Sequence, residues 1–272
     1  MLLNKDLLVD QETYLSNMSK PVSEKLKIVK YFPKNARHIL DVGCADGSIT
    51  AHFAQLFPWV KFHAVDLNEE FINLAKQKFG QIKNISFERV YLRDLLSRDK
   101  RYDAVVFCSV LHEFYTYGQG ISSVLKALAD AHELLINKGR IFIRDMILHK
   151  FTKHADLASI ELVNKIKANH KLTQQIDDFE KLYGKLTNEY NINHFLLKYM
   201  YDDNWERELL ENYTAVTFEE YEKAFELLGM RTQYKESYLI EYLRNKWRTD
   251  FALSEEELDL FRSTGILVAE KI

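Results

Sequence analysis

A glycine turn flanked by carboxylates is the first feature of this sequence that could do chemistry. The stretch ILDVGCADGSIT, residues 39–50, runs from residues that favour a buried strand into a turn containing Gly43 and Gly47. Asp41 comes before the first glycine and Asp46 before the second. A strand, a glycine turn and a helix in this order usually cradle a nucleotide. We therefore expect a nucleotide-like cofactor to lie against this turn.

The spacing of the turn argues against a dinucleotide. The dinucleotide pattern G-x-G-x-x-G needs bare backbone at its second glycine, and Ala45 stands there. Asp41, at the end of the strand, would be unfavourable beside a phosphate but suits a cationic amine or an ordered water. In HAVDLN the next strand ends with Asp66, whose carboxylate can accept both hydroxyls of a ribose. A ribose and a positive charge without phosphate fit S-adenosylmethionine.

Both motifs closely resemble those of the class I S-adenosylmethionine-dependent methyltransferases. LDVGCADGSIT is similar to their first motif, D-x-G-x-G-x-G, with Ala45 replacing the middle glycine, and FHAVDLNEEFINLAKQKF is similar to their second. The resemblance covers residues 38–147 well and the last fifty loosely. It implies an α/β fold with a doubly wound, mostly parallel seven-stranded sheet whose last strand, TGILVAEK, is antiparallel. The cofactor contacts it implies are Asp41, Gly43, Cys44, Ala45, Gly47, Asp66, Leu67 and Ser109.

The adenine contact is ambiguous in this sequence. In the family an acid after the third strand faces the adenine amine, whereas FERVYLRDLLSRDKRYD has Tyr91 and Leu92 near that position. Asp94, offset by two or three residues, is the candidate. Asp94 could equally cap the helix that begins at LLSR, and the sequence leaves both readings open.

Polar side chains gather where the fourth and fifth strands end, which is where open α/β sheets bind substrates. In VVFCSVLHEFYTYG, His112 is the candidate general base, because its unperturbed pKa lies nearest neutrality. Glu113 and Arg144 complete the candidate catalytic set. The candidate acceptor contacts are Tyr115, Tyr117 and Asp145. The structural alternatives are a histidine bonded to a backbone carbonyl, an Arg144–Asp145 ion pair, and tyrosines that only pack. No metal site is expected, because the histidines and cysteines lack ligand spacing.

Strands alternate with helices from residue 38 onwards, which predicts a parallel sheet. We divide the chain into a helical segment at 1–37, a cofactor-binding core at 38–149, a helical cap inserted at 150–214, and a C-terminal completion of the sheet at 215–272. Five aromatic residues give the cap an apolar face: Phe179, Tyr183, Phe195, Tyr199 and Trp205. Such a face could enclose a small acceptor, or it could form a homodimer interface.

Charge and hydropathy restrict the partners. The formal net charge of −3 gives no bulk attraction for nucleic acid or anionic membrane. No apolar run approaches the roughly 18 residues that span a bilayer. MLLNKDLLVDQETY has acids where a secretory signal needs an apolar core. We expect a cytoplasmic protein with reduced, buried thiols at Cys44 and Cys108.

Together these features predict a methyltransferase that uses S-adenosylmethionine to modify a small molecule or a peptide side chain. An RNA (tRNA) methyltransferase is the alternative, because YLIEYLRNKWRTDF mixes basic residues with Tyr242 and Trp247, which could stack bases. A solvated helix face explains that stretch equally well. The alternative of another class is a regulatory module that binds S-adenosylmethionine without turnover. The acceptor atom and the oligomeric state stay open at this point.

Overall fold

A seven-stranded sheet forms the centre of the computed structural model, which describes residues 22–148 and 158–272. Its strand order is β3-β2-β1-β4-β5-β7-β6, and β7 runs antiparallel to both of its neighbours. The strands are β1 His38–Val42, β2 Lys61–Asp66, β3 Ile85–Arg89, β4 Tyr102–Cys108, β5 Leu135–Asp145, β6 Met230–Tyr238 and β7 Thr264–Lys271. The predicted fold class is confirmed. The order reverses between β1 and β4, the kind of point at which ligands bind in open sheets.

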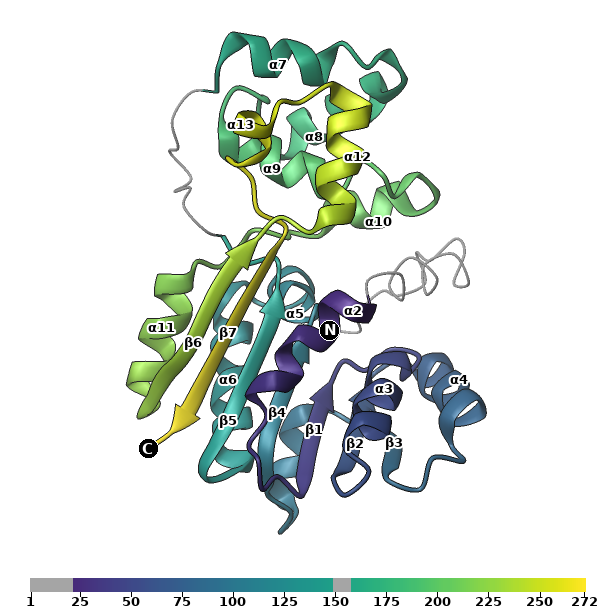
Figure 1. Cartoon of the computed structure of the whole chain (residues 1–272), viewed down its shortest axis with the longest axis vertical. Coiled ribbons are helices and arrows are strands. Elements are labelled where there is room, and N and C mark those ends of the chain that lie inside the picture. Colours follow the sequence, from purple (N-terminus) through teal and green to yellow (C-terminus); the bar gives the residue numbers. More distant parts are fainter. Residues whose placement is uncertain (1–21, 149–157) are drawn as a thin grey trace.

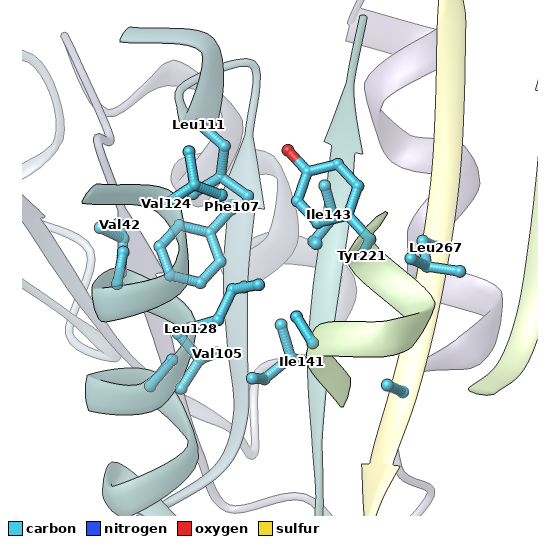
Figure 2. Packing of buried hydrophobic residues seen from close by; sticks show 14 of the residues in the cluster. Val42, Val105, Phe107, Leu111, Val124, Leu128, Ile141, Ile143, Tyr221 and Leu267 are labelled. Atoms are coloured by element: carbon cyan, nitrogen blue, oxygen red, sulfur yellow. The ribbon is translucent and has the colours of Figure 1, made fainter. Parts of the chain in front are cut away.

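Alternating side chains on the strands explain why helices cover both faces of the sheet. On β4, Val105 and Phe107 pack towards α6 (Ile121–Leu134) and α11 (Phe218–Leu227), as Figure 2 shows. Residues between them on β4 pack on the opposite face, against η2 (Leu26–Tyr31) and α3 (Ser48–Leu56). Side chains of a strand point to alternate faces, so this strand is buried on both sides.

Side-chain hydrogen bonds at their N-termini fix where two of the helices begin. Asn68 caps α4 (Glu69–Phe79) by accepting hydrogen bonds from the backbone N–H groups of Glu70 and Phe71. Thr217 and Glu220 form a reciprocal capping box at the start of α11. A short helix that the sequence reading had not assigned, α5 (Leu111–Tyr117), follows β4 directly. It carries the polar residues that we had placed at the end of that strand.

A helical lobe lies beyond the carboxyl ends of β5 and β6 (Figure 1). We call it the cap, and it consists of α7 (Ile160–Lys167), α8 (Thr173–Tyr183), α9 (Glu189–Leu196), α10 (Trp205–Leu210), α12 (Glu241–Phe251) and α13 (Glu255–Leu258). The last two helices lie between β6 and β7 in the chain, in the segment we had assigned to completion of the sheet. Their side chains Leu243, Trp247 and Phe251 pack in one cluster with α7, α8 and α9. The cap is therefore built from two separate stretches of sequence.

The aromatic residues of the cap form its own core. Phe179 and Phe195 are fully buried, and their rings meet edge to face at 5.6 Å. They do not line the cavity next to the sheet. The expectation that this aromatic face encloses an acceptor therefore needs correction, because a helical insertion of this size must first bury its own apolar surface.

The basic stretch on α12 leaves Tyr242 exposed, but its second aromatic residue and its cations are engaged within the cap. Trp247 is fully buried in the cap, and Arg244 forms ion pairs with Glu255 at 2.7 Å and Asp259 at 2.5 Å. Lys246 pairs with Asp250 at 2.9 Å. The charges that could have contacted phosphates are thus matched by neighbouring acids on the cap itself.

Parts of the sequence reading lie outside the described residues. These are the part of the helical segment before residue 22, the last residue of the predicted core at 149, and the beginning of the insertion at 150–157. Within the described ranges, α2 (Val22–Lys25) leads into η2. No helix in those ranges is long and apolar enough to cross a membrane.

The buried position of Trp247 gives a stability prediction. Trp247→Ala should lower the free energy of unfolding by about 3–5 kcal/mol, because it leaves a large cavity in the cap core. Tyr242→Ala, on the same helix but 61% exposed, should change it by less than about 0.5 kcal/mol. Urea denaturation followed by circular dichroism measures both. Equal effects of the two substitutions would contradict the packing described here.

Candidate functional site

The glycine turn is shaped by left-handed backbone at three positions. Gly43 and Gly47 have φ values of +74° and +76°, and Ala45 between them has a φ of +47°. A Cβ on Gly43 would lie 2.4 Å from Cγ2 of Val110, so the close approach of the turn to the chain after β4 requires glycine. The N–H groups of Gly43 and Cys44 both donate to the carbonyl of Val65, at 2.8 and 3.1 Å. These contacts hold the turn against β2.

Asp66, at the end of β2, connects the two sequence motifs. One carboxylate oxygen accepts a hydrogen bond from the N–H of Ala45 at 3.0 Å, and the other accepts one from the N–H of Asn68 at 2.8 Å. Asp66 is 6% exposed, and it lines a cavity in front of the turn. Its carboxylate therefore forms part of the wall of that cavity.

This turn-side cavity has a volume of about 230 Å³. It brings together seven of the predicted residues: Gly43, Ala45, Asp66, Leu67, Ser109, Glu113 and Tyr117. Val90, Tyr91 and Leu92 line it where we had expected an acid. Asp94 is exposed and does not line the cavity, and no side-chain cap bond is found for the short helix that contains it. Gly47, the second glycine of the turn, does not line the cavity, and a Cβ there would lie 2.5 Å from Cε1 of Phe87.

Asp41 and Cys44 border a smaller hollow of about 30 Å³ beside the turn. Asp41 is 2% exposed and accepts a hydrogen bond from the hydroxyl of Thr50 at 2.5 Å. Burial raises the pKa of Asp41 to about 6, although the Thr50 hydroxyl works in the opposite direction. Burial also raises the pKa of the Cys44 thiol, so this cysteine stays a neutral thiol near pH 7.

A second cavity, of about 140 Å³, lies between the cap and the sheet. We call it the cap-side cavity. Ser109 and Glu113 line both this cavity and the turn-side cavity, so the two meet at these residues. Ser109 holds a left-handed φ of +58° directly after β4, and its hydroxyl accepts a hydrogen bond from Nη1 of Arg144 at 3.1 Å. His112 and Arg144 line the cap-side cavity but not the turn-side cavity.

His112 is the centre of a chain of charged groups that joins the sheet to the cap. Its Nδ1 lies 2.7 Å from Oδ1 of Asp145, and its Nε2 lies 3.5 Å from Oε2 of Glu211. Burial opposes a charge on the imidazole, but the two carboxylates outweigh it and raise the pKa of His112 well above its usual value. His112 is therefore an imidazolium near neutral pH. Arg144 and Asp145, at the end of β5, do not pair with each other, because Asp145 is taken by His112.

The cap supplies a set of polar residues that sequence reasoning missed. Arg207 lies 2.7 Å from Glu211, and Tyr117 donates to Glu211 at 2.8 Å. Glu208 accepts a hydrogen bond from the Tyr213 hydroxyl. Burial and the charge of Glu211 raise the pKa of Glu208. The dense run of acids in DDNWERELLENY was the signal available in the sequence, but nothing local showed that it faces His112.

Two of the predicted acceptor contacts also lie apart from both cavities. Asp145 is buried beneath His112, and Tyr115 packs beside the sheet core. Among the residues that the structure describes, no group of three histidine, cysteine or acidic side chains is placed to hold a metal ion. Most of the charged and polar side chains around the cap-side cavity come from α5, from β5, from α10, and from the residues that directly follow β4 and α10.

Ala45 offers a test of backbone strain at the turn. Left-handed backbone costs an L-residue about 1–2 kcal/mol, and the greater entropy of unfolded glycine offsets about 0.5–1 kcal/mol. Ala45→Gly should therefore raise the free energy of unfolding by up to about 1 kcal/mol. The same change at Ala51, inside α3, should lower it by about 1 kcal/mol or more. Thermal or urea unfolding compares the two, and a loss of stability in Ala45→Gly would contradict the strained geometry.

The raised pKa of His112 predicts how stability depends on pH. A pKa that is higher in the folded than in the unfolded chain gives stability that is complete below the unfolded value of 6.5 and lost as pH rises through the folded value. The stability difference between wild type and His112→Gln should therefore shrink as pH rises from 6. Burial, with the charge of Lys271 adding to it, lowers the pKa of His132, so His132→Gln should show the opposite trend. Equilibrium unfolding between pH 5 and 9 measures both, and a flat His112→Gln difference would rule out the cation.

Comparison with known proteins agrees with this geometry. The aligned part of malonyl-[acyl-carrier protein] O-methyltransferase 1 from Ilyobacter polytropus is 26% identical over 107 residues, which are 38% of this chain and 39% of that protein. The chain thus spans less than half the length of that relative. Among solved structures, TnmH superposes with a TM-score of 0.55 at 12% identity, over 96% of this chain and 57% of TnmH.

A second solved structure has a similar extent. The plantazolicin methyltransferase BpumL superposes with a TM-score of 0.52 at 14% identity, over 96% of this chain and 89% of BpumL. At these identities the likeness shows the fold. A family model described as a methyltransferase domain matches residues 40–141, which contain both sequence motifs and β1 to β5 up to Ile141. Residues 40–141 therefore match a methyltransferase domain, in keeping with the class I S-adenosylmethionine-dependent family that the motifs resemble.

Proposed function

We propose that this protein transfers a methyl group from S-adenosylmethionine to a small acceptor enclosed between the sheet and the cap. The observation that carries the proposal is the meeting of two cavities at Ser109 and Glu113. One cavity is lined by the family's cofactor motifs, and the other is lined by polar residues of both the sheet and the cap. A donor and an acceptor held in adjoining cavities gain most of their rate from proximity.

The turn-side cavity fits S-adenosylmethionine. Asp66 places a carboxylate, an acceptor suited to ribose hydroxyls, at one wall, and Leu67, Val90 and Leu92 give an apolar wall suited to a flat base. Among the residues that the structure describes, no basic side chain lines this cavity, in keeping with a cofactor that carries no phosphate. When bound, the cofactor supplies a methyl group on a positively charged sulfur. Its placement in this cavity, with Asp66 as the ribose ligand, is part of the proposal.

The residues of the chain have three tasks in this proposal. Ser109 and Glu113 form the passage between the cavities, and the cap excludes water from it. His112 faces the cap-side cavity and takes the proton of an acceptor hydroxyl if the acceptor is protonated. Because Asp145 and Glu211 keep the imidazole charged, His112 accepts a proton only in the molecules where it is neutral. Transfer to a hydroxyl should thus become faster as pH rises.

A small molecule or a peptide side chain suits the enclosed cavity better than RNA. The cap-side volume of about 140 Å³ admits a small group, and the α12 cations are already paired with acids. The names of two relatives refer to malonyl-[acyl-carrier protein] and plantazolicin, which fits an acceptor of this kind. A cytoplasmic location, and a homodimer through exposed cap residues such as Ile160 and Leu182, belong to the same proposal.

Methyl transfer itself is tested with S-adenosylmethionine carrying a labelled methyl group. The protein is incubated with metabolite, peptide and RNA fractions of a bacterial extract. Label in the metabolite or peptide fraction would support the proposal, and label confined to RNA would replace it with the polymer alternative. Tight binding of S-adenosylmethionine with no labelled product in any fraction would favour a non-catalytic binding module.

Asp66→Asn tests the assignment of the cofactor cavity. The substitution keeps the size of the side chain but removes its charge, so the dissociation constant for S-adenosylmethionine should rise by about 10- to 100-fold, or about 1.5–3 kcal/mol. Asp103 is a matched control, because its carboxylate also accepts two backbone hydrogen bonds, from Arg37 and His38 at 2.8 Å, at the opposite end of β1. Asp103→Asn should leave the affinity unchanged. Isothermal titration calorimetry measures both, and normal binding by Asp66→Asn would remove the cavity from consideration.

A further inference from the structure

Two buried basic side chains line the cap-side cavity without an anionic partner among residues 22–148 and 158–272. Lys25, the last residue of α2, is 5% exposed, and its Nζ has no hydrogen bond or ion pair with any residue in the described ranges. Arg144, at the end of β5, is also 5% exposed. Its Nη1 donates to Ser109, but its Nε has no hydrogen-bond partner. A buried charge without a partner is unfavourable, so this wall of the cavity lowers the stability of the unliganded protein.

Groups around Lys25 do not compensate for its burial. Burial lowers the pKa of Lys25, and the charge of Arg144 adds to that effect. Asp41 and Asp46 act in the opposite direction, but neither forms an ion pair with Lys25 in the part of the chain that the structure describes. Asp46 instead lies 2.9 Å from the ammonium of Lys78. A negative group in the cavity would satisfy both Lys25 and Arg144.

The carboxylates on the opposite wall are already matched. Glu211 contacts Arg207, Tyr117 and His112. Glu208 accepts a hydrogen bond from the Tyr213 hydroxyl. The Tyr117 and Arg207 contacts are at 2.8 and 2.7 Å, so Glu211 is held in the cap and does not reach the two cations. The cavity therefore has one internally neutralised wall and one wall with excess positive charge.

We propose that Lys25 and Arg144 bind a carboxylate group of the acceptor in the cap-side cavity. The inference rests on the proposed function and narrows its acceptor to a small organic acid. A guanidinium and an ammonium that converge on one space suit a carboxylate, which accepts several charged hydrogen bonds at once. Lys25 also borders the small hollow beside the glycine turn. The amino-acid end of the cofactor is thus a second source of a carboxylate, and the experiment must separate the two.

Equilibrium binding to the protein saturated with S-adenosylhomocysteine provides the test. The probes are acetate, malonate and benzoate, each compared with its neutral amide by calorimetry. At least one carboxylate should bind more tightly than its amide. Lys25→Met and Arg144→Met should each weaken that carboxylate about tenfold or more, as loss of a charged hydrogen bond does. Lys27→Met is the control, because this ammonium is exposed and pairs with Glu24 at 2.6 Å.

A second measurement distinguishes lost binding from lost folding. Without ligand, Lys25→Met should have a higher melting temperature than wild type, because it removes an unpaired buried amine. Arg144→Lys retains a charge and should bind the carboxylate better than Arg144→Met. Amides that bind as well as carboxylates would overturn the proposal. So would a Lys25→Met variant that loses affinity for S-adenosylmethionine but keeps affinity for the probes, since the carboxylate would then be that of the cofactor.

Failure of this inference and failure of the proposed function give different results. If the labelled-methyl experiment yields no product in any fraction, the methyltransferase proposal fails, and the probe measurements still report whether the subsite exists. If product forms, anion-exchange chromatography of the extract before the reaction should place the acceptor in the retained, acidic fraction. An acceptor in the unretained fraction would overturn the carboxylate subsite and leave methyl transfer intact.

Discussion

The carboxylate of Asp145 is the interaction on which the site depends. It accepts hydrogen bonds from the backbone N–H groups of Leu111, His112 and Met146, and from the His112 imidazole. These bonds tie the end of β5 to the start of α5, where a negative charge is favourable. They also orient the imidazole so that its other nitrogen faces Glu211 of the cap. The Asp145 carboxylate thus fixes the position of His112, which lines the cap-side cavity and faces Glu211 of the cap.

The residues of the turn-side cavity could be predicted from the sequence because their signals are local. Gly43, Ala45 and Asp66 lie in short motifs whose strand, turn and helix order is visible in the chain, and the structure brings them to one cavity. Asp94 shows the limit of that method. Adenine-side contacts depend on how the chain leaves β3, and here Tyr91 and Leu92 reach the cavity while Asp94 turns to solvent.

The lining of the cap-side cavity could not be predicted from local sequence signals. Glu211 and Lys25 approach His112 and Arg144 only through the tertiary fold, since periodicity reports the face of a helix and not its partner. The same reason explains why α12 was assigned to the sheet segment. Its apolar residues fit any helix that packs on one side, and only the position of Trp247 among α8 and α9 residues reveals the cap.

The division between sheet and cap has a consequence for how such a protein can diversify. The cap buries its apolar residues in a cluster of its own, separate from those on the two faces of the sheet. Of the residues in the described parts of the chain, only Ser109 and Glu113 line both cavities. Substitutions that reshape the acceptor wall from α10 or α12 therefore leave the motifs at the ends of β1 and β2 untouched. Selection can thus reshape the cap-side cavity while the glycine turn and Asp66 stay constant.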